Sequence, residues 1–148
     1  MSDRYAALKL ENQLCFPLYA CAKEITRQYK PFLGNIDLTY TQYIAMMVLW
    51  ENQSIGMKEL GEKLFLDSGT LTPVLKKLEA KGFITRRRLA GDEREVQVTL
   101  TEEGKTLKEK ALDVPEEMRT CVKLDPEEVK TLYRLLYKLL EGMENAGR

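Results

Sequence analysis

The sequence predicts a mainly α-helical protein with a small β-sheet, an α+β fold. Two observations carry this prediction. Apolar residues recur every three or four positions along most of the 148-residue chain, which is typical of amphipathic helices. Between 83 and 100 the pattern changes to alternation of apolar and polar residues around a glycine-containing turn, which is typical of a β-hairpin.

The first two helices are bounded by a proline and a capping sequence. An apolar stripe over Leu8–Tyr29 predicts the first helix, which we expect to end before Pro31. Thr39 followed three residues later by Gln42 forms a capping box for a second helix, which continues through apolar residues to Trp50. The second helix is therefore expected to be almost fully buried.

The next helices are short and closely spaced. Residues 54–56 allow no more than a strand fragment, and 57–64 carry the stripe of a third helix. For the fourth helix, proline's preference for the first helical position places the start at Thr72-Pro73. Asp67 or Ser68 can equally cap an earlier start. The sequence pattern leaves both starts open.

A hairpin and further helices complete the chain. Strands are expected at 83–89 and 95–100, joined by a turn at 90–93. Thr101 begins a fifth helix that runs through Leu112 and bends near proline 115, and Asp125-Pro126 begins the last. The wide apolar arc of that last helix, together with the first helix, predicts burial against a second copy of the chain, a homodimer.

Composition excludes several functions. The length fits a single unit, 1–148, and 23 basic residues balance 23 acidic ones, which excludes a uniformly basic nucleic-acid coat. The absence of histidine excludes histidine-dependent hydrolases, zincins and histidine-based pH switches. With 44% hydrophobic and 31% charged residues, the chain has enough apolar side chains for a core and too many charges for a membrane protein.

The N-terminus and the cysteines indicate the compartment. No apolar stretch approaches the roughly 20 residues of a membrane helix, and no signal peptide is recognisable, so we expect a cytoplasmic protein with reduced thiols. Cys15, Cys21 and Cys121 are an odd number without a Cys-x-x-Cys pair. Neither a disulfide framework nor a metal site is supported, and no cofactor is expected.

The order helix, turn, helix and hairpin over 57–100 is that of a winged helix-turn-helix. Short polar side chains at the start of the second of these helices suit insertion into a major groove. Between Lys76 and Arg88 six of seven charged residues are basic, a net charge of +5, so a local basic face is expected despite overall neutrality. A solvated charged surface is the alternative explanation of that run.

The expected hairpin tip holds Gly91-Asp92-Glu93-Arg94. An arginine on a projecting tip can enter a narrow minor groove, where the potential is most negative, and Asp92 can hold its guanidinium. A turn with a surface ion pair explains the same residues equally well.

The chain resembles the MarR family of bacterial transcription regulators. The broad family is indicated by 66–73, Leu78-Glu79, Gly82 and the Asp92-Glu93-Arg94 wing. Resemblance to the organic hydroperoxide sensors (OhrR type), specifically their two-cysteine subclass, rests on a second set of residues: 10–16, Tyr19, 29–31, 38–40 and, for the subclass, Cys121.

The resemblance implies a homodimeric repressor on pseudo-palindromic, double-stranded operator DNA, and it favours a fourth helix starting near Ser68. Residues 5–36 and 102–146 would form the dimerisation helices and 39–100 the DNA-binding region. The predicted DNA-binding residues are Ser68, Thr70, Lys76, Lys77, Arg86, Asp92 and Arg94.

For the sensor, the resemblance assigns oxidation by organic hydroperoxide to Cys15 and support of its thiolate to tyrosine hydroxyls across the dimer, those of Tyr19, Tyr29 and Tyr40. It further implies that Cys121 of the other subunit forms a disulfide with oxidised Cys15, which releases the DNA. Cys21 is expected to be structural. Without the resemblance, Cys15 would be assigned as a small core residue and the tyrosines as core or interface aromatics.

Two other functions remain as alternatives. One is a repressor of the same fold gated by a non-covalent aromatic or phenolic ligand, with structural cysteines. The other is a thiol peroxidase, which the absence of a thioredoxin-like pattern disfavours. We therefore expect a regulator and not an enzyme.

Overall fold

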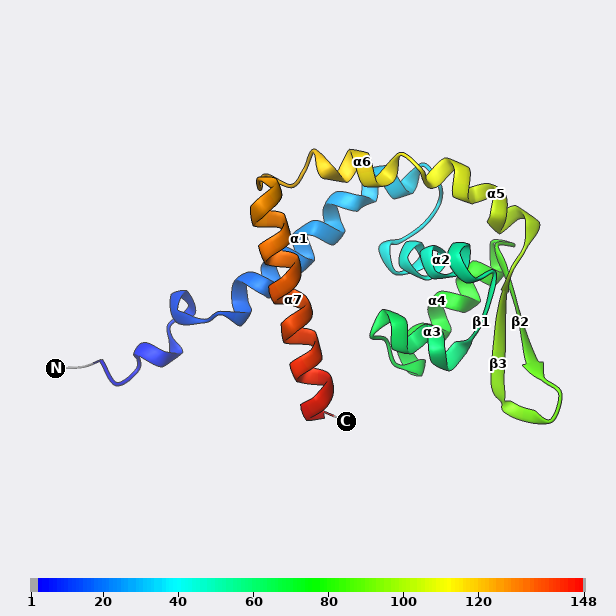
Figure 1. The fold of residues 1–148 in the computed structure, drawn as a ribbon, viewed down its shortest axis with the longest axis horizontal. Coiled ribbons are helices and arrows are strands. Elements are labelled where there is room, and N and C mark those ends of the chain that lie inside the picture. The colour runs from blue at the N-terminus through cyan, green and yellow to red at the C-terminus, as the bar shows by residue number, and fades with distance from the viewer. Residues whose placement is uncertain (1–2, 148) are drawn as a thin grey trace.

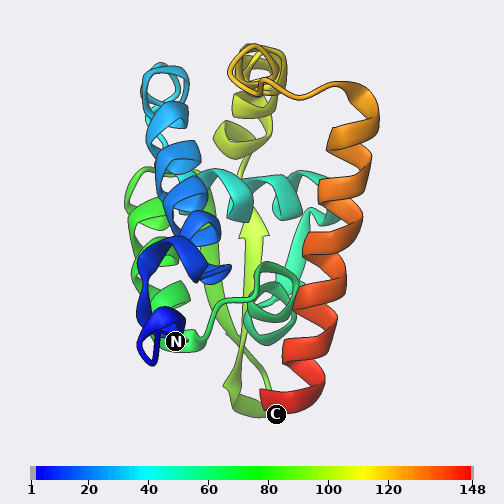
Figure 2. The ribbon, with the colours of Figure 1, turned by 90° about the vertical axis from the view of Figure 1, so that its left-hand side faces the viewer.

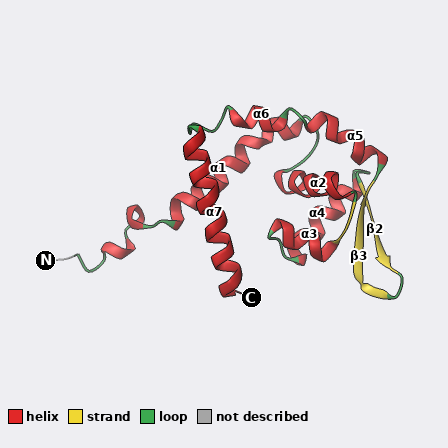
Figure 3. Ribbon diagram, in the orientation of Figure 1, coloured by secondary structure: helices red, strands yellow, loops and turns green. Residues whose placement is uncertain are grey.

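A small antiparallel sheet, two of whose strands extend as a hairpin, lies at one end of a mainly helical fold (Figures 1 and 3). The computed structural model describes residues 3–147. The predicted fold class is confirmed. In chain order the elements are η1 (Ala6–Leu8), η2 (Leu10–Asn12), α1 (Cys15–Gly34), α2 (Tyr40–Asn52), β1 (Ser54–Gly56), α3 (Met57–Leu64), α4 (Ser68–Ala80), β2 (Ile84–Leu89), β3 (Asp92–Leu100), α5 (Glu102–Ala111), α6 (Val114–Arg119) and α7 (Pro126–Gly147).

The first helix differs from the prediction at both ends. The expected helix over Leu8–Tyr29 instead begins at Cys15 and continues past Pro31. Pro17 has no N–H and its ring clashes with the carbonyl four residues earlier, so the first turn of a helix is where it costs least. At the other end, Leu33 is 1% exposed, and its packing in the core offsets the hydrogen bond that Pro31 removes.

The fourth helix begins at Ser68, so the earlier of the two predicted starts is correct and the proline rule is wrong here. Asp67 is the N-cap, and its carboxylate accepts a 2.7 Å hydrogen bond from the backbone N–H of Thr70. Pro73 lies inside the helix. The cap and the burial of Leu71 in the core outweigh the one hydrogen bond that the proline costs.

The Asp67 cap predicts a pH-dependent contribution to stability. The hydrogen bond from the Thr70 N–H holds the pKa of the Asp67 carboxyl below its ordinary value. A lowered pKa means that the contribution is complete above the unfolded value of about 3.9 and is lost as pH falls through the folded value. We expect Asp67→Ala to lower the melting temperature at pH 7 and the difference from wild type to shrink below about pH 4.

Thermal melts across this pH range measure the effect. Asp67→Asn is the matched control, because asparagine caps a helix without titrating. A wild-type advantage of equal size at pH 7 and pH 3 would contradict the assignment.

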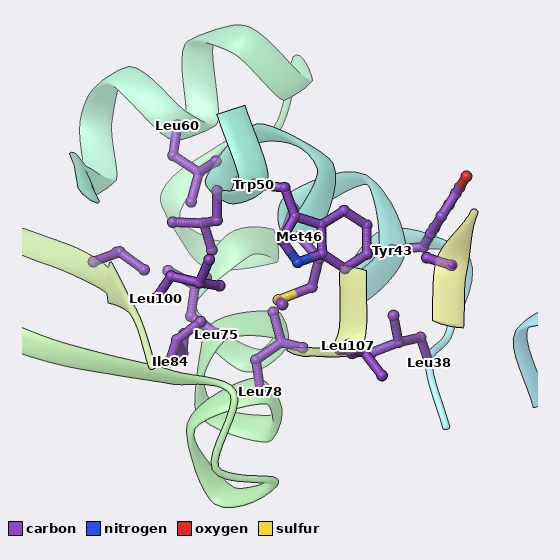
Figure 4. Close-up of a cluster of buried hydrophobic side chains, with 14 of the residues drawn as sticks. Leu38, Tyr43, Met46, Trp50, Leu60, Leu75, Leu78, Ile84, Leu100 and Leu107 are labelled. Carbon is purple, nitrogen blue, oxygen red and sulfur yellow. The ribbon is translucent and has the colours of Figure 1, made fainter. Parts of the chain in front are cut away.

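The sheet ties the hairpin to the helices. Its strands lie in the order β1-β3-β2, all antiparallel, with Ile84 opposite Leu100 and Ile55 opposite Val98. These apolar side chains face a core built mainly from α2, α3 and α4 (Figure 4). At its edge the Trp50 indole N–H donates a 2.9 Å hydrogen bond to the Gly104 carbonyl, which fixes α5 against α2.

Two further boundaries differ from the prediction. The expected turn at 90–93 is shorter, because Leu89 already pairs with Asp92 and Gly91 adopts a φ of +94°, a conformation that a two-residue loop requires and glycine tolerates. The expected bend near Pro115 is a complete break between α5 and α6. Pro115 lies in the first turn of α6, where its missing N–H costs nothing.

The terminal helices contribute little to this core. Figure 1 superposes α1 and α7, but the rotated view in Figure 2 shows them on opposite sides of the molecule. Large apolar side chains are exposed along both helices and the segment before α1: Tyr5, Leu8, Leu10, Leu14, Phe16, Tyr19, Ile25, Val129, Leu132, Tyr133, Leu135, Leu136, Tyr137, Leu139 and Met143. Within residues 3–147, no helix is both long and apolar enough to cross a membrane.

Candidate nucleic-acid interface and thiol site

The α4 helix turns a polar face outward. Leu71, Leu75 and Leu78 are buried, whereas Thr70 and Lys77 are exposed and lie on one line of the helix, seven residues or about two turns apart. Ser68 and Lys76, the other predicted residues of this helix, are also exposed. All four are therefore accessible to a partner lying along α4.

The hairpin beside α4 carries further basic residues. Arg87 and Arg88 are exposed on β2. The backbone of Asp92 and Arg94 belongs to β3, but their side chains lie outside the part of the structure that is described. The predicted interaction of these two residues with a minor groove stays a prediction.

Arg86 has a partner within the chain. Its guanidinium lies 3.0 Å from one oxygen of Glu79, and its backbone N–H donates to the other oxygen at 3.1 Å. Glu79 thus joins α4 to β2, an edge strand of the sheet. The pair partly neutralises Arg86, whose predicted phosphate contact is untested.

Lys81, which the basic run from 76 to 88 includes, points away from the outer face. Its ammonium group bonds Asp37, in the segment between α1 and α2, and Gln42, in the first turn of α2. The exposed basic side chains of the run are therefore those of Lys76, Lys77, Arg87 and Arg88. The local charge available to a ligand is smaller than the sequence count of +5 implies.

A cluster of tyrosines lies where α1 meets α2. The ring centroids of Tyr29 and Tyr40 are 4.9 Å apart, and Tyr43 lies 5.9 and 6.4 Å from them. Burial raises the pKa of all three phenols above the ordinary value, and for Tyr29 and Tyr43 neighbouring tyrosines add to the increase. The hydroxyls remain protonated at neutral pH and can donate hydrogen bonds.

Two of the predicted tyrosines belong to this cluster and one does not. Tyr29 and Tyr40 are brought together as ring neighbours, whereas Tyr19 is 65% exposed on α1. Tyr43 was missed from the sequence. Its spacing of three residues from Tyr40 on one helix was the available signal.

Cys15 is far from these tyrosines within one chain. It is exposed as the first residue of α1, and Tyr29 follows fourteen residues later, about 21 Å along the helix axis. A contact between the Cys15 sulfur and the tyrosine cluster therefore requires a second copy of the chain. Cys21, expected to be structural, is exposed on the same helix.

The third cysteine lies between α6 and α7. Cys121 follows α6, is partly buried, and has its sulfur 3.9 Å from the backbone oxygen of Glu117. The three thiols are free. Across residues 3–147, no cluster of three or more acidic or cysteine side chains is arranged to hold a metal ion.

The helix-turn-helix, the hairpin and the apolar terminal helices define the class of winged helix-turn-helix transcription regulators. Residues 27–111 match the family of SarA/Rot transcriptional regulators. The organic hydroperoxide resistance transcriptional regulator of Bacillus subtilis is 50% identical over 143 residues, which cover 97% of each chain. The chain belongs to this family of transcription regulators, and its similarity to the organic hydroperoxide resistance regulator extends over nearly its whole length.

Solved structures agree with this assignment. The chain superposes on reduced AbfR bound to DNA with a TM-score of 0.75 and 34% identity, covering 92% of this chain and 94% of that one. A disulfide-formed state of AbfR matches with a TM-score of 0.63 and 34% identity, covering 90% of this chain and 93% of that one.

Proposed function

We propose that two copies of this chain form a cytoplasmic repressor that binds pseudo-palindromic operator DNA and leaves it when an organic hydroperoxide oxidises Cys15. The observation that carries the proposal is the separation of Cys15 from the tyrosine cluster. An exposed thiol at the start of α1, and partly buried tyrosines where the far end of α1 meets α2, become one site only when two chains pair.

The dimer uses the terminal segments, 5–36 and 102–146, and leaves 39–100 free for DNA. The apolar side chains exposed along α1 and α7 support this division, because such an area is unusual on a monomer. Two α4 helices related by a two-fold axis then read two half-sites of the operator.

On each half-site, α4 enters the major groove. Ser68, Thr70, Lys76 and Lys77 contact bases or phosphates from its exposed face. Arg94, braced by Asp92, enters the minor groove at the wing tip, and Arg86 contacts a phosphate. The DNA-bound state of AbfR supports DNA binding by a chain of this fold.

The oxidation proceeds in two balanced steps. The Cys15 thiolate attacks one peroxide oxygen, the O–O bond breaks, and the leaving alkoxide takes a proton from solvent to become an alcohol, so that sulfur becomes a sulfenic acid. The Cys121 thiol of the other subunit then attacks that sulfur, an S–S bond forms, and water leaves. Hydroxyls of Tyr19, Tyr29 and Tyr40 from the partner donate hydrogen bonds to the thiolate before attack.

The disulfide step is supported by the disulfide-formed state of AbfR and by the placement of Cys121 after α6. The chemistry consumes one peroxide per thiol pair and needs an outside reductant to reset. The chain therefore acts as a regulator rather than as an enzyme.

Operator titration of the reduced and the cumene-hydroperoxide-treated protein tests the proposal. We expect treatment to weaken binding by about tenfold or more, and Cys15→Ser to bind in the reduced state but not respond. On non-reducing gels the treated wild type should run as a covalent dimer.

Two variants separate the steps. Cys121→Ser should abolish the covalent dimer, whereas the control Cys21→Ser should leave it intact. A covalent dimer that persists in Cys121→Ser would overturn the pairing. Equal affinity of reduced and treated wild type would overturn redox sensing and favour gating by a non-covalent ligand.

A further inference from the structure

Lys81 at the end of α4 is held by three acceptors from another part of the chain. Its ammonium group donates to the backbone oxygen of Asp37 and, at 2.9 Å, to the side-chain oxygen of Gln42, and it lies 3.6 Å from the Asp37 carboxylate. The Lys81 side chain is only 25% exposed. The ammonium group therefore fastens the end of α4 to the segment between α1 and α2.

Gln42 makes this connection specific. It is 2% exposed, and its side-chain oxygen also accepts a 3.1 Å hydrogen bond from the Thr39 N–H. In return the Gln42 N–H donates to the Thr39 hydroxyl at 3.3 Å, which completes the capping box of α2. Lys81 thus bonds the same buried oxygen that defines where α2 begins.

The tyrosine cluster uses the same turn of α2. Tyr40 and Tyr43 flank Gln42 in the chain, and both rings contact Tyr29 of α1. The first turn of α2 therefore contacts Tyr29 through Tyr40 and Tyr43, and it contacts Lys81 at the end of α4 through Gln42. Because Tyr40 and Tyr43 share a helical turn with Gln42, we expect a displacement of their rings to shift the capping box and the Lys81 contact.

The backbone on both sides of the Lys81 contact also has little conformational freedom. After Lys81, Gly82 adopts a φ of +84°, and the Phe83 N–H bonds the Leu78 oxygen, which closes the end of α4. Asp37, a non-glycine residue with a φ of +55°, holds the loop on the other side of the ammonium group. The backbone conformation therefore fixes the positions of both Lys81 and Asp37.

We infer that Lys81 is a positioning residue that transmits the state of the tyrosine cluster to the DNA-reading helix. The inference rests on the proposed function, because it is oxidation at the partner's thiol site that displaces the tyrosines. The displaced turn of α2 pulls the end of α4 through Lys81 and changes the angle at which Thr70 and Lys77 meet the groove. Lys81 acts without touching DNA.

Lys81→Met, which keeps the length of the side chain and removes the donors, tests the coupling. The readout is the ratio of operator dissociation constants after and before cumene hydroperoxide treatment. We expect this ratio to fall by about fivefold or more relative to wild type, while the rate of Cys15 thiol loss stays the same. Lys81→Arg, which retains the positive charge and the donors, should restore most of the ratio.

Lys105→Met is the matched control. Lys105 pairs with Glu102 at 2.9 Å within α5 and should keep the wild-type ratio. A structural role alone would lower the melting temperature of Lys81→Met without changing its ratio, and that result overturns the inference while leaving the proposed function standing. A ratio of one in wild type overturns both.

Discussion

Gly104→Ala is expected to lower the free energy of unfolding by about 2–4 kcal/mol, more than most single methyl additions. A β-carbon at this position would lie 2.3 Å from the Phe83 backbone oxygen and 2.7 Å from a methyl of Leu100. Backbone cannot yield as a flexible side chain can. Any shift of α5 would also strain the hydrogen bond from Trp50 to the Gly104 carbonyl.

Urea unfolding at a fixed protein concentration measures this effect. Gly34→Ala is the matched control, since nothing lies within 4 Å of its added methyl. Because alanine restricts the unfolded chain, the control should change stability by less than about 1 kcal/mol and in the stabilising direction. Equal stabilities of the two variants would contradict the close packing of α5 on the sheet.

Leu136→Glu is expected to convert the proposed dimer into monomers and to weaken operator binding by about a hundredfold or more, because two linked half-site contacts become one. Leu136 lies in the middle of the apolar stripe of α7, between Leu132 and Leu139, and all three are at least 36% exposed in the single chain. Burying a carboxylate among these side chains would be costly.

Analytical ultracentrifugation should give about the 17.1 kDa chain mass for this variant and twice that for wild type. Lys138→Gln changes the net charge by the same single unit on the opposite side of α7 and should remain dimeric. A dimeric Leu136→Glu protein that binds the operator normally would exclude α7 from the interface.

Sequence patterns located the elements whose boundaries are set by neighbouring residues. The capping box of Thr39 and Gln42 and the cap at Asp67 are visible within four residues, and both are present in the structure. Errors arose where one local rule opposed another. The apolar stripe predicted a start of α1 at Leu8, but Pro17 holds the start at Cys15. Pro73 is accommodated inside α4 because the cap and the core stabilise the earlier start.

Features of the site that depend on distant residues were not accessible in this way. Lys81 and Gln42 are 39 positions apart, and no periodicity connects them. A count of basic residues could not separate Lys81 and Arg86, which bond to other parts of the chain, from Lys77, which is exposed. Tyr43 resembled an ordinary core residue until its ring was placed against Tyr29 and Tyr40.

The indole that anchors α5 also makes the protein a natural fluorophore. Trp50 is the single tryptophan of the chain, 8% exposed, so its emission arises from one defined, nearly dry environment. Its ring meets Tyr43 edge-on at 6.5 Å, close enough for energy absorbed by the tyrosine cluster to reach it. Rearrangement of those tyrosines therefore has an optical signature in the unlabelled protein, readable in real time as peroxide is added.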